Sequence, residues 1–301
     1  MYKYLGFGMH IASEIEFPEL LPADFKDAEI SIVLGKTPES LEGADVTKRA
    51  FSSISKDEYL LTIKNICRYY VGHGNRIVAE PVAGIDEHSL RLFLLGTVMA
   101  AILYQRGNIP LHASAIVKNG ELILFAGNSG AGKSTLLAWL ATKGYDIFTD
   151  DVCVLQNNIP VNTGICGTAS YPMIKLWEDA ILQLDNGIFN KDFKVRPQLP
   201  KYGQFFYDTF RKESLPVDKI FILSPKNNVD EITVKRLEGI QAFRQMEKQA
   251  YKYQLITNTK LRNLHFSLLS QLINQAQIFE VIRPVNGTSV ELLLDAIENL
   301  F

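Results

Sequence analysis

The chain has 301 residues, of which 47% are hydrophobic and 21% charged, and this apolar content excludes a mainly disordered protein. Its 31 basic and 33 acidic side chains leave a net charge of −2, so no basic field favours binding to nucleic acid or to an anionic membrane. Three cysteines without CxxC spacing argue against a disulfide framework and favour a reducing cytoplasm, and the length predicts about two domains.

Residues 1–84 are predicted to form a β-rich N-terminal domain. Short segments rich in β-branched and aromatic residues, at 30–35, 59–63, 67–72 and 76–81, are separated by turn residues. This pattern is typical of strands. The last three segments predict an antiparallel meander.

Residues 85–108 predict a buried connecting helix. Apolar side chains such as Leu90, Leu94 and Ala101 recur at spacings of three and four residues, and the segment is apolar nearly all round. The apolar stretch 92–104 is shorter than the roughly 20 residues that span a bilayer. We therefore expect a core helix, with a membrane-associated helix as the alternative.

Residues 109–301 alternate strands and helices, which predicts an α/β domain. The turn at Asn119-Gly120 predicts a hairpin whose second strand leads into a glycine-rich loop. A helix over 133–143 follows and ends before Gly144. Beyond it we expect strand, loop and strand at 145–155, a loop-rich stretch at 156–216, strands at 218–223, 232–237 and 278–284, and helices at 239–255, 259–276 and 288–300.

The glycine-rich loop, residues 127–134, matches the phosphate-binding motif G-x-x-x-x-G-K-[ST]. Glycines let backbone N–H groups surround phosphate oxygens, and the positive end of the following helix points at the same place. Lys133 would reach the β- and γ-phosphates, and Ser134 would supply a hydroxyl to Mg²⁺. The loop predicts binding of ATP and Mg²⁺, through Gly127, Asn128, Ser129, Gly130, Ala131, Gly132, Lys133, Ser134 and Thr135.

Three further polar residues are candidates for the chemistry. Asp150 and Asp151 end the apolar segment that follows the loop helix, and in an open α/β sheet ligands bind at this edge. One carboxylate would accept a hydroxyl proton while the other faces the metal; the alternative is a solvated turn. His112 lies on the strand expected to pair beside the loop, where it is either functional or structural.

Together LHASAI, GNSGAGKST and TDDVCVL resemble the HPr kinase/phosphorylase family, over about residues 110–155. The resemblance implies an HPr-kinase-like P-loop domain behind the smaller β-rich domain, and ATP-dependent phosphorylation of serine. It implies that Asp150 is the general base, that His112 supports it or the phosphate, and that Ser134 and Asp151 serve Mg²⁺. Because the family often assembles, a homo-oligomer is also expected.

The sequence departs from the classical family members after the Asp pair. Their glycine-rich, arginine-containing segment is not found, and residues 168–184 read TASYPMIKLWEDAILQL. This string is similar to the HPr-kinase-related enzymes of peptide natural-product clusters, including kinases of the C-terminal serine of lasso peptide precursors. The departure speaks against HPr as the substrate and against the reverse phosphorylase reaction.

Two other regions are weaker candidates. In the basic stretch 190–197, Arg196 is expected to reach the transferred phosphoryl group, because a guanidinium binds phosphate with two hydrogen bonds; the alternative is a solvated charge. Lys175 and Trp177 are candidates for lining the site; the alternative, which is expected, is that Ile174, Leu176 and Trp177 simply pack.

The sequence thus predicts a cytoplasmic kinase that uses ATP and Mg²⁺. Its acceptor is expected to be a serine hydroxyl of a peptide or small protein, such as a lasso-type precursor. The alternatives are a nucleotide-binding regulator or assembly protein without transfer, and a kinase for a small hydroxylated metabolite. Asp150 favours an enzyme, because a pure binder needs no base.

Overall fold

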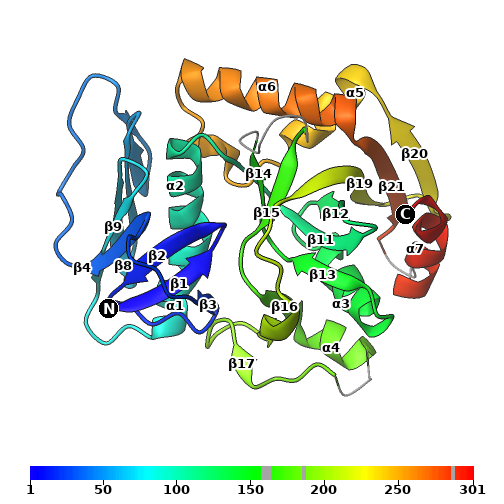
Figure 1. Ribbon diagram of the computed structural model, residues 1–301, viewed down its shortest axis with the longest axis horizontal. Helices are drawn as coiled ribbons and strands as arrows, with labels where there is room; N and C mark the ends of the chain where they lie inside the picture. The colour runs from blue at the N-terminus through cyan, green and yellow to red at the C-terminus, as the bar shows by residue number, and fades with distance from the viewer. Residues whose placement is uncertain (157–163, 185–187, 286–288) are drawn as a thin grey trace.

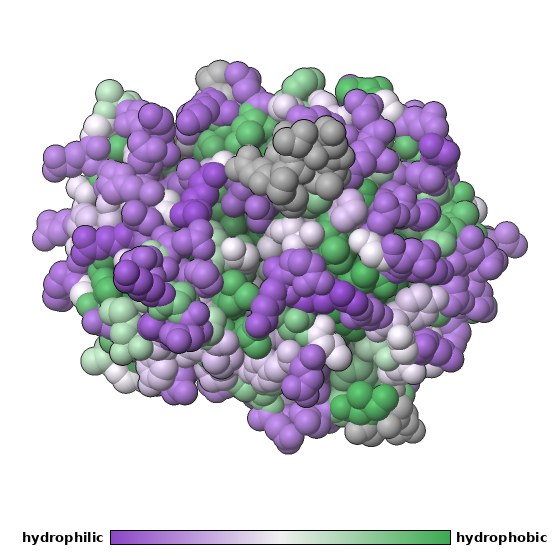
Figure 2. Space-filling view, viewed as in Figure 1, coloured by the Kyte–Doolittle hydropathy of each residue, from purple (hydrophilic) through white to green (hydrophobic). Residues whose placement is uncertain are grey.

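The computed structural model describes residues 1–156, 164–184, 188–285 and 289–301. In this part of the chain helices are mixed with several β-sheets, which confirms the predicted α/β class in its general form. Figure 1 shows the N-terminal sheet on one side, the rest of the chain on the other, and helix α2 between them. The face seen in Figure 2 is mostly hydrophilic, with apolar residues in small groups.

The N-terminal sheet has the strand order β3-β1-β2-β4-β9-β8-β7-β6-β5. The expected antiparallel meander is confirmed as β7, β8 and β9, whereas the hairpin of β1 and β2 was not expected. The strands are β1 (Tyr2–Gly6), β2 (Met9–Ser13), β3 (Leu21–Pro22), β4 (Ile30–Leu34), β5 (Thr47–Lys48), β6 (Ser52–Ile54), β7 (Glu58–Ile63), β8 (Cys67–Gly72) and β9 (Arg76–Pro81).

The connecting helix runs over 19 residues, as α1 (Glu87–Phe93), a π-helical turn η1 (Leu94–Val98) and α2 (Met99–Gln105). It begins where the Asp86 carboxylate accepts a hydrogen bond from the Ser89 backbone N–H. By length and composition it could cross a membrane, but 67% of it is buried. It is therefore a core helix in this structure.

The hydrophobic core around this helix is shared between the N-terminal sheet and the rest of the chain. Phe7 and Phe17 of the N-terminal part pack in one cluster with the helix and with Val154 and Met173 from beyond it. The predicted domain boundaries at 84 and 108 lie at the two ends of the helix, and the core runs across both of them.

The second sheet has the order β10-β14-β15-β19-β12-β11-β13, with β21 paired to β19 and β20 to β21. Strands β12, β19 and β21 are parallel. The hairpin turn is confirmed, since Asn119 and Gly120 have φ of 54° and 84°. The strands are β10 (Ile109–Leu111), β11 (Ala113–Lys118), β12 (Glu121–Gly127), β13 (Asp146–Thr149), β14 (Cys153–Gln156), β15 (Cys166–Ala169), β19 (Leu215–Lys226), β20 (Thr233–Leu237) and β21 (Gln277–Pro284).

Helices cover both faces of this sheet (Figure 1). Ile123 and Phe125 of β12 pack with α3 (Lys133–Thr142) and α7 (Val290–Ile297). Leu122 and Leu124, on the opposite face, pack with α5 (Gly239–Glu247) and α6 (Thr259–Gln275). This alternation follows from the two-residue period of a strand, and the loop after β12 leads into α3 on one of these faces.

The prediction of a loop-rich stretch at 156–216 is wrong for most of the residues that the structure describes there. A small sheet is formed by β16 (Met173–Trp177), β18 (Lys201–Phe205) and β17 (Phe193–Lys194), with α4 (Glu178–Leu184) directly after β16. Residues 157–163 and 185–187 lie outside the described residues. The sheet was missed because β16 and β18 pair across a long intervening segment, which no local pattern reveals.

Two C-terminal helices are shorter than predicted. Helix α5 ends at Glu247, because the chain then turns and Ala250 pairs with Leu111 of β10. Helix α7 begins at Val290, where the Ser289 hydroxyl accepts a hydrogen bond from the Leu292 N–H. Position 288 of the predicted helix lies outside the described residues.

A buried ion pair joins the N-terminal part of the chain to the connecting helix, and its contribution to stability can be measured. Arg91 Nε lies 3.0 Å from Glu19 Oε1, and both side chains are less than 10% exposed. Arg91→Met should lower the free energy of unfolding by about 3–5 kcal/mol, because it leaves a carboxylate buried and unpaired. Urea unfolding measures the loss. Glu87, an exposed second partner of Arg91, is the control: Glu87→Ala should cost about 0–1 kcal/mol, and equal losses would contradict this assignment.

Candidate active site

The glycine-rich loop lies between β12 and α3, as the sequence predicts. Gly127, Gly130 and Gly132 have φ of 140°, 82° and 96°, values that side chains disfavour. A Cβ at Gly127 would lie 2.6 Å from the carbonyl oxygen of Leu223 on β19. The loop therefore passes close to the neighbouring strand only because glycine stands there.

Lys133 opens α3, and its side chain turns back over the loop. Its Nζ donates to the carbonyl oxygens of Gly127, at 2.7 Å, and Asn128, at 3.2 Å. Burial lowers the pKa of Lys133 to about 8, against the opposing effect of the carboxylates of Asp150 and Asp151. Phosphate oxygens that entered the loop would replace these carbonyls as partners of the ammonium group.

Asp150 joins three elements at the edge of the sheet. Its Oδ1 accepts hydrogen bonds from the hydroxyls of Ser114, at 2.6 Å, and Ser134, at 2.9 Å. Its Oδ2 accepts one from the backbone N–H of Lys175 at 3.0 Å. The side chain is fully buried and does not line the pocket beside the loop. The prediction of Asp150 as general base does not fit this geometry, because an acceptor hydroxyl cannot reach it.

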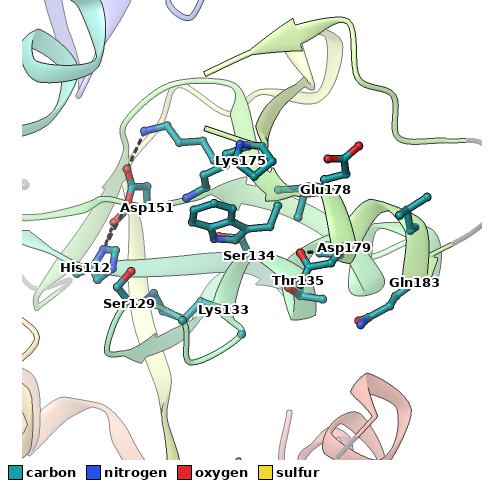
Figure 3. A pocket seen from close by; sticks show the side chains of 18 residues that line it. His112, Ser129, Lys133, Ser134, Thr135, Asp151, Lys175, Glu178, Asp179 and Gln183 are labelled. Atoms are coloured by element: carbon teal, nitrogen blue, oxygen red, sulfur yellow. Dashed lines mark hydrogen bonds and ion pairs between the residues drawn. The ribbon is translucent and has the colours of Figure 1, made fainter. Parts of the chain in front are cut away.

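Asp151 points the other way and lines the pocket. Its φ of 69° is left-handed, a conformation that Asp tolerates better than most residues. Lys175 Nζ lies 2.8 Å from its Oδ2, as Figure 3 shows. Burial alone would raise the pKa of Asp151, but the charges of Lys175 and His112 hold it well below its ordinary value. Asp151 is therefore ionised at neutral pH and accessible from the pocket.

His112 lies beside Asp151, as expected from its position before β11. Its Nδ1 is 2.9 Å from the backbone carbonyl oxygen of Asp151 and 3.4 Å from Oδ1. Burial, and then the charge of Lys133, lower the pKa of His112, while Asp151 opposes them. The imidazole is thus neutral at pH 7, and the carbonyl assigns the proton to Nδ1.

The pocket that these residues share has a volume of about 790 Å³. Of the nine loop residues predicted to bind nucleotide, six line it. The other three loop residues do not line the pocket: Gly127 and Ala131 are buried, and Asn128 is exposed to solvent. The lining residues are His112, Ser129, Gly130, Gly132, Lys133, Ser134, Thr135, Asp151, Lys175, Leu176, Trp177, Glu178, Asp179, Ala180, Leu182, Gln183, Pro200 and Lys201.

Ser134 is the residue that fits a magnesium ion, with Asp150 behind it as the partner that holds its hydroxyl. Among the described residues no group of three or more His, Cys, Asp and Glu side chains could hold a metal by itself. Mg²⁺ bound with phosphates, however, uses only one or two protein oxygens, and the Ser134 hydroxyl is held by Asp150. The metal role predicted for Asp151 fits less well, because Lys175 already pairs with that carboxylate.

Arg196 does not take part in the pocket. It does not line it, and its charge acts on Asp86 at the start of α1. There burial works to raise the pKa of Asp86, but the Ser89 N–H and the charges of His88 and Arg196 lower it. The prediction that Arg196 meets the transferred group is therefore not supported. Arg196 lies instead near Asp86, where the connecting helix begins.

Lys175, Trp177 and Lys201 line the pocket instead. Packing, which was expected for Ile174, Leu176 and Trp177, holds for Ile174 and Leu176, which are buried in the core. The signal in the sequence was the alternation Ile-Lys-Leu-Trp, which places Lys175 and Trp177 on one face of a strand. Lys201 is paired with Trp177 where β16 and β18 run side by side, and the local sequence does not predict that pairing.

Arg283 is a further residue that the sequence analysis missed. It lies at the carboxyl end of β21, and its Nη2 donates to the carbonyl oxygen of Ala131 at 3.0 Å. No ion pair involves it among the described residues. Arg283 therefore supports the glycine-rich loop through its backbone. Its position at the carboxyl end of a parallel strand is the sequence feature that could have identified it.

Comparisons with known proteins add a distant structural likeness. No protein-family model matches the chain, and no curated protein matches it. Among solved structures it is similar to the Hpr(Ser) kinase/phosphatase from Coxiella burnetii, with 15% sequence identity and a TM-score of 0.34. The match covers 64% of this chain and 89% of that one. The residues of the pocket, and not this likeness, carry the functional interpretation.

The lowered pKa of Lys133 predicts how nucleotide affinity depends on pH. With a pKa of about 8, Lys133 is charged in about nine-tenths of the molecules at pH 7 and in about one-tenth at pH 9. If phosphate binds the charged form, affinity for Mg²⁺-bound ATP should fall about tenfold between these pH values. Calorimetric titration measures this, with Lys133→Met as the control that binds weakly at both. An affinity that stays level or rises would contradict it.

Proposed function

We propose that this protein is a cytoplasmic kinase that uses ATP and Mg²⁺ to phosphorylate a serine hydroxyl of a peptide or small protein. One observation carries the proposal: the carboxylates of two adjacent residues diverge. Asp150 turns inward to Ser134 at the start of α3, and Asp151 turns into the pocket that the glycine-rich loop lines. A metal-side carboxylate and an acceptor-side carboxylate are thus held apart by the backbone.

Each group has a role in the proposed transfer. The loop N–H groups and Lys133 bind the β- and γ-phosphates, and Ser134, held by Asp150, binds Mg²⁺. The bond from the serine oxygen to the γ-phosphorus forms as the bond from that phosphorus to the bridging oxygen breaks. ADP leaves, and the hydroxyl proton passes to Asp151.

The low pKa of Asp151 is compatible with this role. In a loose transition state the hydroxyl loses its proton late, so an ionised carboxylate serves chiefly to orient the nucleophile. His112 holds the backbone of Asp151 through its Nδ1–H, and Lys175 fixes the carboxylate. We take His112 and Lys175 as positioning residues.

For the acceptor we propose a ribosomally made peptide precursor of the lasso type. Support comes from the resemblance carried by residues 168–184, which include β16 and α4 along the pocket. We also retain the expectation of a homo-oligomer as part of this proposal.

A nucleotide-binding regulator without transfer is the second candidate. It is favoured by the Lys175–Asp151 ion pair, which gives this carboxylate a partner within the protein. In a regulator the pair would have only a structural role, and Asp151 would be dispensable for any chemistry.

Replacement of Asp151 separates the two candidates. Asp151→Asn keeps an oxygen for Lys175 but cannot accept the proton, so transfer from γ-labelled ATP to serine-containing peptides should fall about 10²–10⁴-fold. ATP affinity should stay within about twofold, since the loop is unchanged. Serine-free versions of the peptides measure the background.

The matched control is the neighbouring carboxylate. Asp150→Asn should instead weaken the dependence of ATP binding on Mg²⁺, because it disturbs Ser134. If Asp151→Asn retains full transfer while Asp150→Asn loses it with Mg²⁺-dependent binding intact, the roles proposed for the two residues are wrong. Absence of transfer to any peptide, with ATP bound, favours the regulator.

A further inference from the structure

The pocket extends well beyond the glycine-rich loop. Figure 3 shows His112 and Asp151 at one end, and Thr135, Asp179 and Gln183 at the other. Strand β16 runs along the wall between these ends, because Lys175 reaches Asp151 while Glu178, three residues on, begins α4. The part of the pocket along α4 has no role in the proposed transfer of the phosphoryl group.

Trp177 is the aromatic side chain of this second part. It stands two residues after Lys175 on the same strand, so both side chains point to the same face. Its side chain is 45% exposed, and Lys201 Nζ lies 5.5 Å from the ring centre. That cation–π contact orients an indole which otherwise remains open to the pocket.

The neighbouring residues of α4 have the chemistry of a site for a flat heterocycle. Leu182 lines the pocket and is 64% exposed, so two large apolar groups face the same space. Asp179 and Gln183 line the same end and offer oxygens and an amide to polar groups of a ligand. Apolar walls with a few polar groups are typical of a small-molecule site.

Resting on the proposed function, which supplies the triphosphate site, we propose that the base of the donor nucleotide stacks on Trp177 along α4. Thr135 directly follows Ser134 in the first turn of α3, so a nucleotide with its phosphates in the loop leads its nucleoside past Thr135 towards α4. The donor is then a nucleoside triphosphate and not an inorganic polyphosphate. The acceptor enters from the Asp151 end.

Tryptophan fluorescence gives a direct readout. The chain has two tryptophans, and Trp139 lies at a different pocket, beside Lys143 and Tyr145. In a Trp139→Phe background, Mg²⁺-bound ATP should change the Trp177 emission, and Mg²⁺-bound tripolyphosphate should bind without changing it. An equal change with both ligands, or none with bound ATP, would overturn the stacking.

Calorimetry of Trp177→Ala measures the contribution of the ring. Affinity for ATP should fall about tenfold, affinity for tripolyphosphate should change less than twofold, and Trp177→Phe should retain most of the ATP affinity. Because the side chain is nearly half exposed, its removal leaves the core intact. Far-UV circular dichroism checks this.

The outcomes separate this inference from the proposed function. If neither ligand binds the wild-type protein, or Lys133→Met binds both as well as wild type, the proposed phosphate site fails. If both bind through Lys133 but Trp177→Ala weakens them equally or not at all, the phosphate site stands and the stacking inference is wrong. A change in Trp177 emission caused only by an acceptor peptide would assign this part of the pocket to the acceptor.

Discussion

The site depends on one buried carboxylate. Asp150 has no exposed surface, and burial of a carboxyl group is tolerated only where hydrogen bonds replace those it makes with water. Three donors do so, from Ser114 before the loop, Ser134 after it, and the backbone of Lys175 on β16. These donors belong to β11, α3 and β16. Hydrogen bonding to the one carboxylate of Asp150 therefore holds the three elements close together.

The outward direction of Asp151 follows from the same constraint. With Asp150 turned inward, the next residue adopts a left-handed backbone and presents its side chain to the pocket. The Thr149 hydroxyl donates to the carbonyl oxygen of Val152 at 2.9 Å and closes the turn around the pair. Such local strain is typical of positions where function fixes a side chain. Two neighbouring carboxylates thereby acquire different environments: Asp150 is buried, and Asp151 lines the pocket.

Strand β16 links the pocket to the body of the protein. Its first residue, Met173, belongs to the core shared with the N-terminal sheet, and Ile174 and Leu176 belong to the core under α3. Lys175 and Trp177, which alternate with them along the strand, line the pocket. The position of the pocket wall therefore depends on packing in both cores, which gives the N-terminal sheet a structural connection to the site although none of its residues lines the pocket.

The sequence predicted the parts of this arrangement that local patterns encode. The loop at 127–134, its flanking strand and helix, and the Asn119-Gly120 hairpin follow from spacing and glycine placement, and His112 was expected near the Asp pair. Which of Asp150 and Asp151 faces the pocket depends on the backbone at this turn, where Asp151 has a left-handed φ, and this cannot be read from residue types.

The remaining differences come from pairing between distant segments. Lys201 meets Trp177 only because β18 pairs with β16, and Arg283 reaches the loop from the far end of β21. Arg196 had a suitable charge for the phosphoryl group. Its neighbour Phe193, however, packs against His88 of α1, and Arg196 itself does not line the pocket.

A crystal structure of the protein with Mg²⁺ and a non-hydrolysable ATP analogue tests the central claim most directly. We expect Lys133 Nζ to leave the carbonyl oxygens of Gly127 and Asn128 for the phosphates, Ser134 to bind the metal beside Asp150, and Asp151 to face the terminal phosphorus with room for a hydroxyl between them. Metal bound by Asp151 with Asp150 turned into the pocket, or a nucleotide bound away from the loop while Lys133 keeps its carbonyl partners, would contradict it.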